Sequence, residues 1–274
     1  MFLVITLFFL ILFLLYKLKN LEKFELHKEN TIYTLWMSKH PMSKERKSAL
    51  ESLRKTSECN VVLITLKDVK KYEIPGNPIH PAFEYLSDIH KADYFRCYMM
   101  HNHGGGYSDL KKTTGSWKKS FDKLRNNKDI WALGLNADHD WSFALPDNLS
   151  EEERKNIEKD VSKMIGVGYF IYKKNTPLTK EWIIELHRVL DVNYDLLKKH
   201  PAKYPRESSA GLKVPEWERE YKKIKVNENK TKYPIFWNRI LAQINCPIQH
   251  KYLKHISTGL PHPDPGNYKA LNSI

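Results

Sequence analysis

The sequence predicts an α/β protein, because short apolar segments typical of strands alternate with segments typical of helices from about residue 31 onward. TIYTLW at 31–36 and NVVLITL at 60–66 combine β-branched and aromatic residues, as buried strands do. Between them, Ser43 is the expected N-cap of a helix that ends near Lys55. A strand, a helix and a strand at this spacing predict two parallel strands joined by a crossover helix.

The same alternation continues along the chain. Further helices are expected over 81–103, 117–124, 150–165, 176–200 and 233–244, and further strands over 107–110, 130–135 and 166–174. Ser150 precedes three glutamates, which is the pattern of a helix N-terminus. The part after Pro201 is basic and rich in proline and aromatic residues, but nothing there forces a domain boundary. We therefore expect a single domain over 31–274.

The N-terminal segment predicts a membrane anchor. Residues 2–16 carry no charged side chain, and Leu18, Leu21 and the snorkelling Lys17 and Lys19 extend the apolar run toward the length that spans a bilayer. We expect an anchor over 1–21 and a linker over 22–30. The alternative, a cleaved signal peptide, lacks positive charge before the apolar run and small residues after it.

The orientation of this single-pass anchor follows from charge. Lysines directly after the apolar run favour a cytosol-facing domain by the positive-inside rule. The lumenal orientation is the alternative, and only there would the sequons at Asn148 and Asn229 be used.

The net charge of +13 suits nucleic acid, an anionic membrane surface or a phosphorylated ligand. The lysines are spread along the chain and no nucleic-acid-binding motif is present, so no nucleic acid partner is expected. Three cysteines without a CxxC pair give neither a disulfide framework nor a zinc-ribbon spacing.

The central segment contains most of the candidate functional residues. Asp93 and Arg96 lie three residues apart on a mostly apolar helix, where they either form a buried ion pair or meet a polar ligand. The glycines at 104–106 end that helix, and the strand at 107–110 presents Asp109 near its end. The carboxyl ends of strands are where α/β sheets bind ligands, and the ammonium of Lys111 suits a phosphate.

The string KADYFRCYMMHNHGGGYSDLK at 91–111 resembles the signature of the DXD-containing sugar-binding glycosyltransferases, a group that includes initiating mannosyltransferases and capsular polysaccharide synthesis proteins. That signature has an acidic residue and an arginine on a helix, then two glycines, a tyrosine and Asp-x-Asp. The positions that agree here, in order, are Asp93, Arg96, Gly104, Gly105, Tyr107 and Asp109. The resemblance extends more loosely over about 31–190.

The resemblance implies a GT-A-like, Rossmann-type mixed sheet flanked by helices, with a nucleotide-sugar donor across the carboxyl ends of the first strands. It implies that Trp36 lies near the base, Asp93 and Arg96 near the ribose and sugar hydroxyls, and Asp109 near the sugar and diphosphate. The residues expected to bind the donor are Trp36, Asp93, Arg96, Gly105, Gly106, Tyr107 and Ser108, and those expected to be catalytic are Asp109 and Lys111.

One position departs from the family pattern. The second carboxylate of Asp-x-Asp helps to hold a divalent cation on the diphosphate, but this chain has Asp109-Leu110-Lys111. Either the Lys111 ammonium replaces Mn²⁺ or Mg²⁺ as counter-charge, or the site no longer catalyses. A third interpretation places a metal on Asp109, or on Asp138 and Asp140 after the strand at 130–135.

The resemblance, taken with the apolar N-terminal segment, implies a membrane-anchored glycosyltransferase. It would move a sugar from a nucleoside diphosphate sugar to a glycan, lipid or protein acceptor, and its chemistry would not depend on a metal. The alternative is a catalytically inactive relative that binds or scaffolds.

Overall fold

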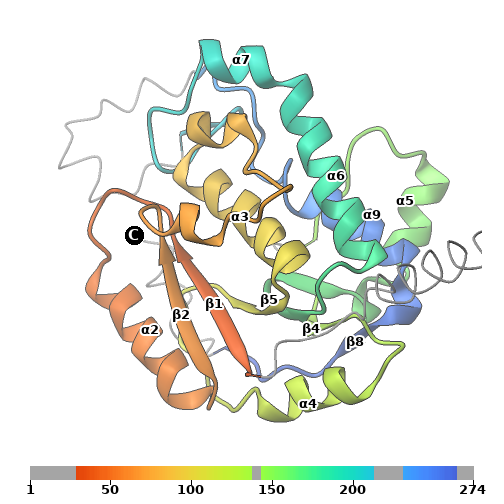
Figure 1. Ribbon diagram of the computed structural model, residues 1–274. Helices are drawn as coiled ribbons and strands as arrows, with labels where there is room; N and C mark the ends of the chain where they lie inside the picture. Colours follow the sequence, from red (N-terminus) through yellow and green to blue (C-terminus); the bar gives the residue numbers. More distant parts are fainter. Residues whose placement is uncertain (1–28, 138–142, 213–230, 264–274) are drawn as a thin grey trace, which may run out of the picture.

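The computed structural model describes residues 29–137, 143–212 and 231–263. These residues form a mixed α/β fold with a six-stranded sheet, so the predicted fold class is confirmed at that level (Figure 1). The predicted anchor over 1–21 and most of its linker lie outside the described residues. Within the described ranges no helix has the length and apolar character needed to cross a membrane.

The strand order of the main sheet is β2-β1-β3-β5-β4-β8. β1 is parallel to both β2 and β3, β5 is antiparallel to β3 and β4, and β4 is parallel to β8. The strands are β1 (Thr31–Trp36), β2 (Asn60–Thr65), β3 (Gly105–Ser108), β4 (Ala132–Asn136), β5 (Ile165–Tyr172) and β8 (Ile256–Thr258). A separate two-stranded ribbon consists of β6 (Glu207–Ser208) and β7 (Gly211–Leu212).

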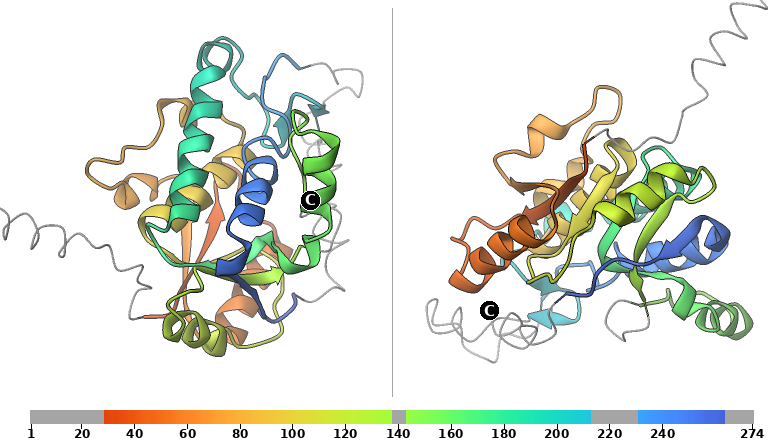
Figure 2. Two further views of the ribbon diagram at one scale, coloured as in Figure 1. Left: turned by 90° about the vertical axis from the view of Figure 1, so that its right-hand side faces the viewer. Right: turned by 90° about the horizontal axis from the view of Figure 1, so that it is seen from below.

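Helices cover both faces of the sheet. α4 lies on the face opposite to α6 and α9 (Figure 2). Buried side chains of α2 and α4 pack with Ile32 and Leu133 into one core, and α3, α6 and α9 pack with Tyr33 and Phe170 into the larger one. The α-helices are α2 (Lys44–Thr56), α3 (Asp88–Asn102), α4 (Lys118–Asn126), α5 (Glu151–Glu158), α6 (Pro177–Val192), α7 (Tyr194–Lys199) and α9 (Ala242–Lys251).

The predicted parallel unit at the start of the domain is confirmed. β1 and β2 pair in parallel over six residues, from Thr31 opposite Asn60 to Trp36 opposite Thr65. α2 connects them, and its N-cap is Ser43, whose Oγ accepts a hydrogen bond from the Arg46 backbone N–H at 3.2 Å. At α5 the predicted start at Ser150 is also confirmed, and a reciprocal capping box with Glu153 is present.

Four predicted helices were wrong in extent. The segment 150–165 is α-helical only over Glu151–Glu158, and a 3₁₀ turn at Val161–Lys163 leads into β5. The segment 81–103 splits into a 3₁₀ turn, Pro81–Tyr85, and α3, because Leu86 and Ser87 are extended. The segment 176–200 splits at Asn193, whose side-chain amide bonds the Val189 carbonyl and competes with a continuous helix. The segment 233–244 is helical only from Ala242 onward. Its first residues instead pack on α3, where the Tyr233 hydroxyl bonds the buried His90 ring.

The glycine triplet follows α3 and begins β3. Gly104 and Gly105 have φ values of +68° and +99°, which favour glycine. A Cβ atom would lie 2.9 Å from the Lys174 backbone N at Gly104 and 3.0 Å from the Thr31 carbonyl oxygen at Gly105. The triplet therefore turns the chain from α3 into the middle of the sheet, and Asp109 follows directly after β3.

Candidate functional site

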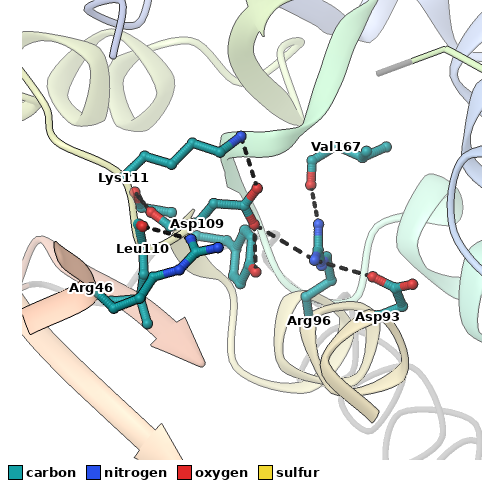
Figure 3. A network of polar contacts seen from close by, with 9 residues as sticks. Arg46, Asp93, Arg96, Asp109, Leu110, Lys111 and Val167 are labelled. Atoms are coloured by element: carbon teal, nitrogen blue, oxygen red, sulfur yellow. Dashed lines mark hydrogen bonds and ion pairs between the residues drawn. The ribbon is translucent and has the colours of Figure 1, made fainter. Parts of the chain in front are cut away.

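The candidate site lies at the edge of the sheet where the parallel strands β1 and β3 end. Because β5 is antiparallel to β3, its first residues lie at the same edge, with Tyr169 opposite Ser108. The Asp109 backbone N–H donates a 2.9 Å hydrogen bond to the Gly168 carbonyl. α3 brings Asp93 and Arg96 to this edge, and the turn that follows β3 brings Asp109 and Lys111 (Figure 3).

The Asp109 carboxylate is held by three side chains. The Tyr107 hydroxyl donates to Oδ1 at 2.9 Å, Arg96 lies 3.6 Å from Oδ1, and the Lys111 ammonium lies 3.4 Å from Oδ2. Burial acts to raise the pKa of Asp109, but Lys111, Arg96 and Tyr107 outweigh it and lower the pKa below its usual range. The Asp109 side chain is 26% exposed, more than its partners in the cluster, so it is the carboxylate that a ligand can reach.

Arg96 is the centre of the cluster. Its guanidinium donates to the Val167 carbonyl at 2.5 Å, pairs with Asp93 at 3.1 Å and lies 4.4 Å above the Tyr107 ring. Its Nε atom is buried and has no hydrogen-bond partner within the described part of the chain. Burial raises the pKa of Asp93 to about 7, against the opposing effect of Arg96. Of the two alternatives for Asp93 and Arg96, the buried ion pair is present, and Arg96 extends it to Asp109.

Lys111 is folded back onto Asp109. Its backbone N–H donates to the Asp109 carbonyl at 2.8 Å, so a tight turn joins the two residues. Its side chain is 9% exposed, and the ammonium lies 5.6 Å from the centre of the Tyr169 ring. The turn and the ring fix a cation beside the carboxylate.

Arg46 also belongs to the site, although no sequence pattern indicates it. Arg46 lies in the first turn of α2, and its guanidinium donates a 2.8 Å hydrogen bond to the Leu110 carbonyl (Figure 3). It contributes a further positive charge that lowers the pKa of Asp109. The carbonyls of Val167 and Gly168 are likewise site groups that no side-chain pattern indicates.

Of the other expected donor-binding residues, Trp36 and Ser108 lie at the same edge, whereas Gly105 and Gly106 lie at the opposite end of β3. Trp36 is half-buried at the end of β1, and its indole N–H donates to the His40 carbonyl at 2.8 Å. Ser108 is buried, and its hydroxyl donates to the Asp109 carbonyl. The space beside Gly105 and Gly106 is filled by the protein's own Thr31, Tyr33 and core side chains, so packing accounts for these two glycines.

The groups around Asp109 do not fit a divalent cation. Tyr107 and Arg96 occupy Oδ1, and an ammonium faces Oδ2, where it would repel the metal. Asp138 and Asp140, the alternative ligands, lie outside the described residues. Among the residues that are described, no group of three or more His, Cys, Asp or Glu side chains has a metal-binding arrangement.

Comparison with known proteins returned no match, either to a family model or to a curated protein. The assignment of a function therefore depends on the geometry of the site and on the motif resemblance.

Proposed function

We propose that this chain is a glycosyltransferase that takes its sugar from a nucleoside diphosphate sugar. The acceptor is a hydroxyl of a glycan, lipid or protein, and the chain is anchored in the membrane through residues 2–21 with its domain facing the cytosol. The sheet is the GT-A-like, Rossmann-type mixed sheet that the resemblance implies.

The observation that carries the proposal is that the residues of the motif lie together in the folded chain. Asp93, Arg96, Tyr107 and Asp109 are spread over 17 residues of sequence, and all four belong to one cluster of ion pairs, hydrogen bonds and ring contacts. The cluster lies at the carboxyl ends of two parallel strands, the place where sheets of this kind bind nucleotides. A purely structural ion pair would explain Asp93 and Arg96 but not the partly exposed carboxylate beside them.

The chemistry needs a positioned donor and a stabilised leaving group. During transfer, the bond between the anomeric carbon and the diphosphate oxygen breaks, and its electron pair stays on the diphosphate. The acceptor oxygen forms the new bond to the anomeric carbon and gives up its proton to solvent. Asp109 is suited to orient the sugar by accepting hydrogen bonds from its hydroxyls, because its low pKa keeps it ionised. Cations around the site are suited to stabilise the diphosphate.

The test is a donor screen with the full-length chain in detergent. Purified protein is incubated with UDP-, GDP-, dTDP- and ADP-sugars, and release of the nucleoside diphosphate is measured with and without membrane extracts as acceptor. We expect release from one nucleotide class and loss of at least a hundredfold in Asp109→Asn. Absence of release and transfer with every donor would contradict the proposal.

A second candidate, a catalytically inactive relative that binds a nucleotide or glycan, is favoured by one observation. Asp109 already has three partners within the protein, as a carboxylate in a purely structural role would. Under this alternative, nucleotide sugars bind and shift the melting temperature, but neither hydrolysis nor transfer occurs.

A further inference from the structure

The position of the Lys111 ammonium suggests how the site handles a diphosphate. The ammonium lies 3.4 Å from Asp109 Oδ2, on the side of the carboxylate left open by Tyr107 and Arg96. The backbone turn from Asp109 to Lys111 and the Tyr169 ring hold the ammonium there. The pair is thus a preformed carboxylate and cation, joined by the chain itself.

A divalent cation and this ammonium exclude each other. Mg²⁺ bonds carboxylate oxygens at about 2.1 Å. A metal at that distance from Oδ2 would share the oxygen with the ammonium, at a separation where two positive charges repel strongly in a nearly buried site. Lys111 cannot simply swing into bulk water, because its side chain is only 9% exposed and its backbone is bonded to Asp109.

We infer that the Lys111 ammonium takes the place of a divalent cation as the counter-charge of a nucleoside diphosphate, so that the site binds this ligand without metal. The inference rests on the proposed function and deepens it. The ammonium places a fixed positive charge beside the Asp109 carboxylate, and an ammonium is a compact charge that suits phosphate oxygens. Because the cation is covalently part of the chain, its position does not vary with the metal concentration.

The first experiment is calorimetric titration of the full-length chain in detergent with UDP, GDP, dTDP and ADP, in EDTA and in MnCl₂. We expect one nucleotide to bind in EDTA with an affinity that Mn²⁺ does not increase. Lys111→Met should weaken this binding by about ten- to a hundredfold, the effect of losing a charge-assisted hydrogen bond. Lys119→Met is the matched control, since it removes the same charge from an exposed position on α4, and it should leave the affinity unchanged.

The second experiment restores the acidic residue that the family pattern has at position 111. Lys111→Asp removes the ammonium and supplies a second carboxylate two residues after Asp109. We expect this variant to bind Mn²⁺, observed as loss of the free-ion signal in electron paramagnetic resonance, and to bind the nucleotide only when Mn²⁺ is present. The wild-type chain should leave the Mn²⁺ signal unchanged.

The outcomes separate the inference from the proposed function. Wild-type binding that requires Mn²⁺, or Lys111→Met binding as tightly as wild type in EDTA, overturns the inference and leaves the proposed function standing. No binding of any nucleotide under either condition overturns both. If Lys111→Asp does not fold, the comparison of wild type, Lys111→Met and Lys119→Met still decides.

Discussion

The Asp109 carboxylate occupies space that is available because residue 168 is a glycine: a Cβ atom on Gly168 would lie 3.0 Å from Asp109 Oδ2. The Gly168 backbone is not in a left-handed conformation, so alanine is compatible with it. Gly168→Ala should therefore displace the carboxylate from its present position while leaving the backbone conformation unstrained. We expect about a tenfold loss of nucleotide affinity in calorimetry.

Gly134→Ala provides the contrast to Gly168→Ala. Its Cβ atom would lie 2.8 Å from the Tyr169 carbonyl oxygen, a backbone atom that cannot easily move. This variant should lose stability in urea but keep its affinity per folded molecule. Equal affinities of Gly168→Ala and wild type would show that the exact position of the Asp109 carboxylate does not matter for binding.

Asp93 should make the fold less stable as the pH rises from about 4 to 7. Burial raises its folded-state pKa to about 7, above its ordinary value of 3.8, so the folded protein binds the proton more tightly than the unfolded chain does. Stability is then greatest below the unfolded pKa, falls as the pH rises toward the folded pKa, and levels off above it. The titratable groups that interact with Asp93 are Arg96, Asp109 and the uncharged Tyr233 hydroxyl.

The test of this dependence is Asp93→Asn. The free energy of unfolding of Asp93→Asn relative to that of wild type should rise from pH 4 to pH 8, because only wild type loses stability when Asp93 ionises. Urea curves that stay parallel from pH 4 to pH 8 would contradict the raised pKa.

Removing Arg96 should be severely destabilising. Arg96→Met leaves Asp93 and Asp109 without their shared cation and the Val167 carbonyl without its donor, and breaking a buried pair in this way costs about 3–5 kcal/mol. The double variant Asp93→Asn/Arg96→Met should be less destabilised than the sum of the two single variants, because one uncompensated charge is gone. Additive effects in urea unfolding would show that the pair is not coupled.

Asn148 reports the orientation of the domain. It is exposed in the loop before α5 and begins the sequon Asn148-Leu149-Ser150. With the domain in the cytosol, the chain made in a eukaryotic cell should migrate unchanged after treatment with an N-glycosidase. A shift that disappears in Asn148→Gln combined with Asn229→Gln would instead place the domain in the lumen.

The sequence predicted the parts of the fold that depend on local pattern. The β1–α2–β2 unit follows from hydrophobic periodicity and the Ser43 cap, and the burial of Asp93 and Arg96 follows from the apolar residues around them on α3. Each of these features is determined by neighbours within a few residues.

The parts that were wrong or missing depend on contacts between distant segments. α3 begins at Asp88 because Ser87 is extended, with its backbone N–H on the Tyr233 hydroxyl, 146 residues away. Arg46 reaches the site through a backbone carbonyl 64 residues away, and a carbonyl carries no sequence signal. Spacing indicated that Asp109 and Lys111 were neighbours, but only the three-dimensional structure shows the ammonium facing the carboxylate.

The burial of α3 also determines how the site moves. Nine of its fifteen residues are buried, on more than one side of the helix, and they contact the sheet, α6 and the segment around Tyr233. Because the helix is packed on more than one side, it cannot separate from its neighbours while the rest of the domain stays folded. Its amide protons should exchange with deuterium only through global unfolding, so Asp93 and Arg96 are carried on the slowest-exchanging part of the molecule.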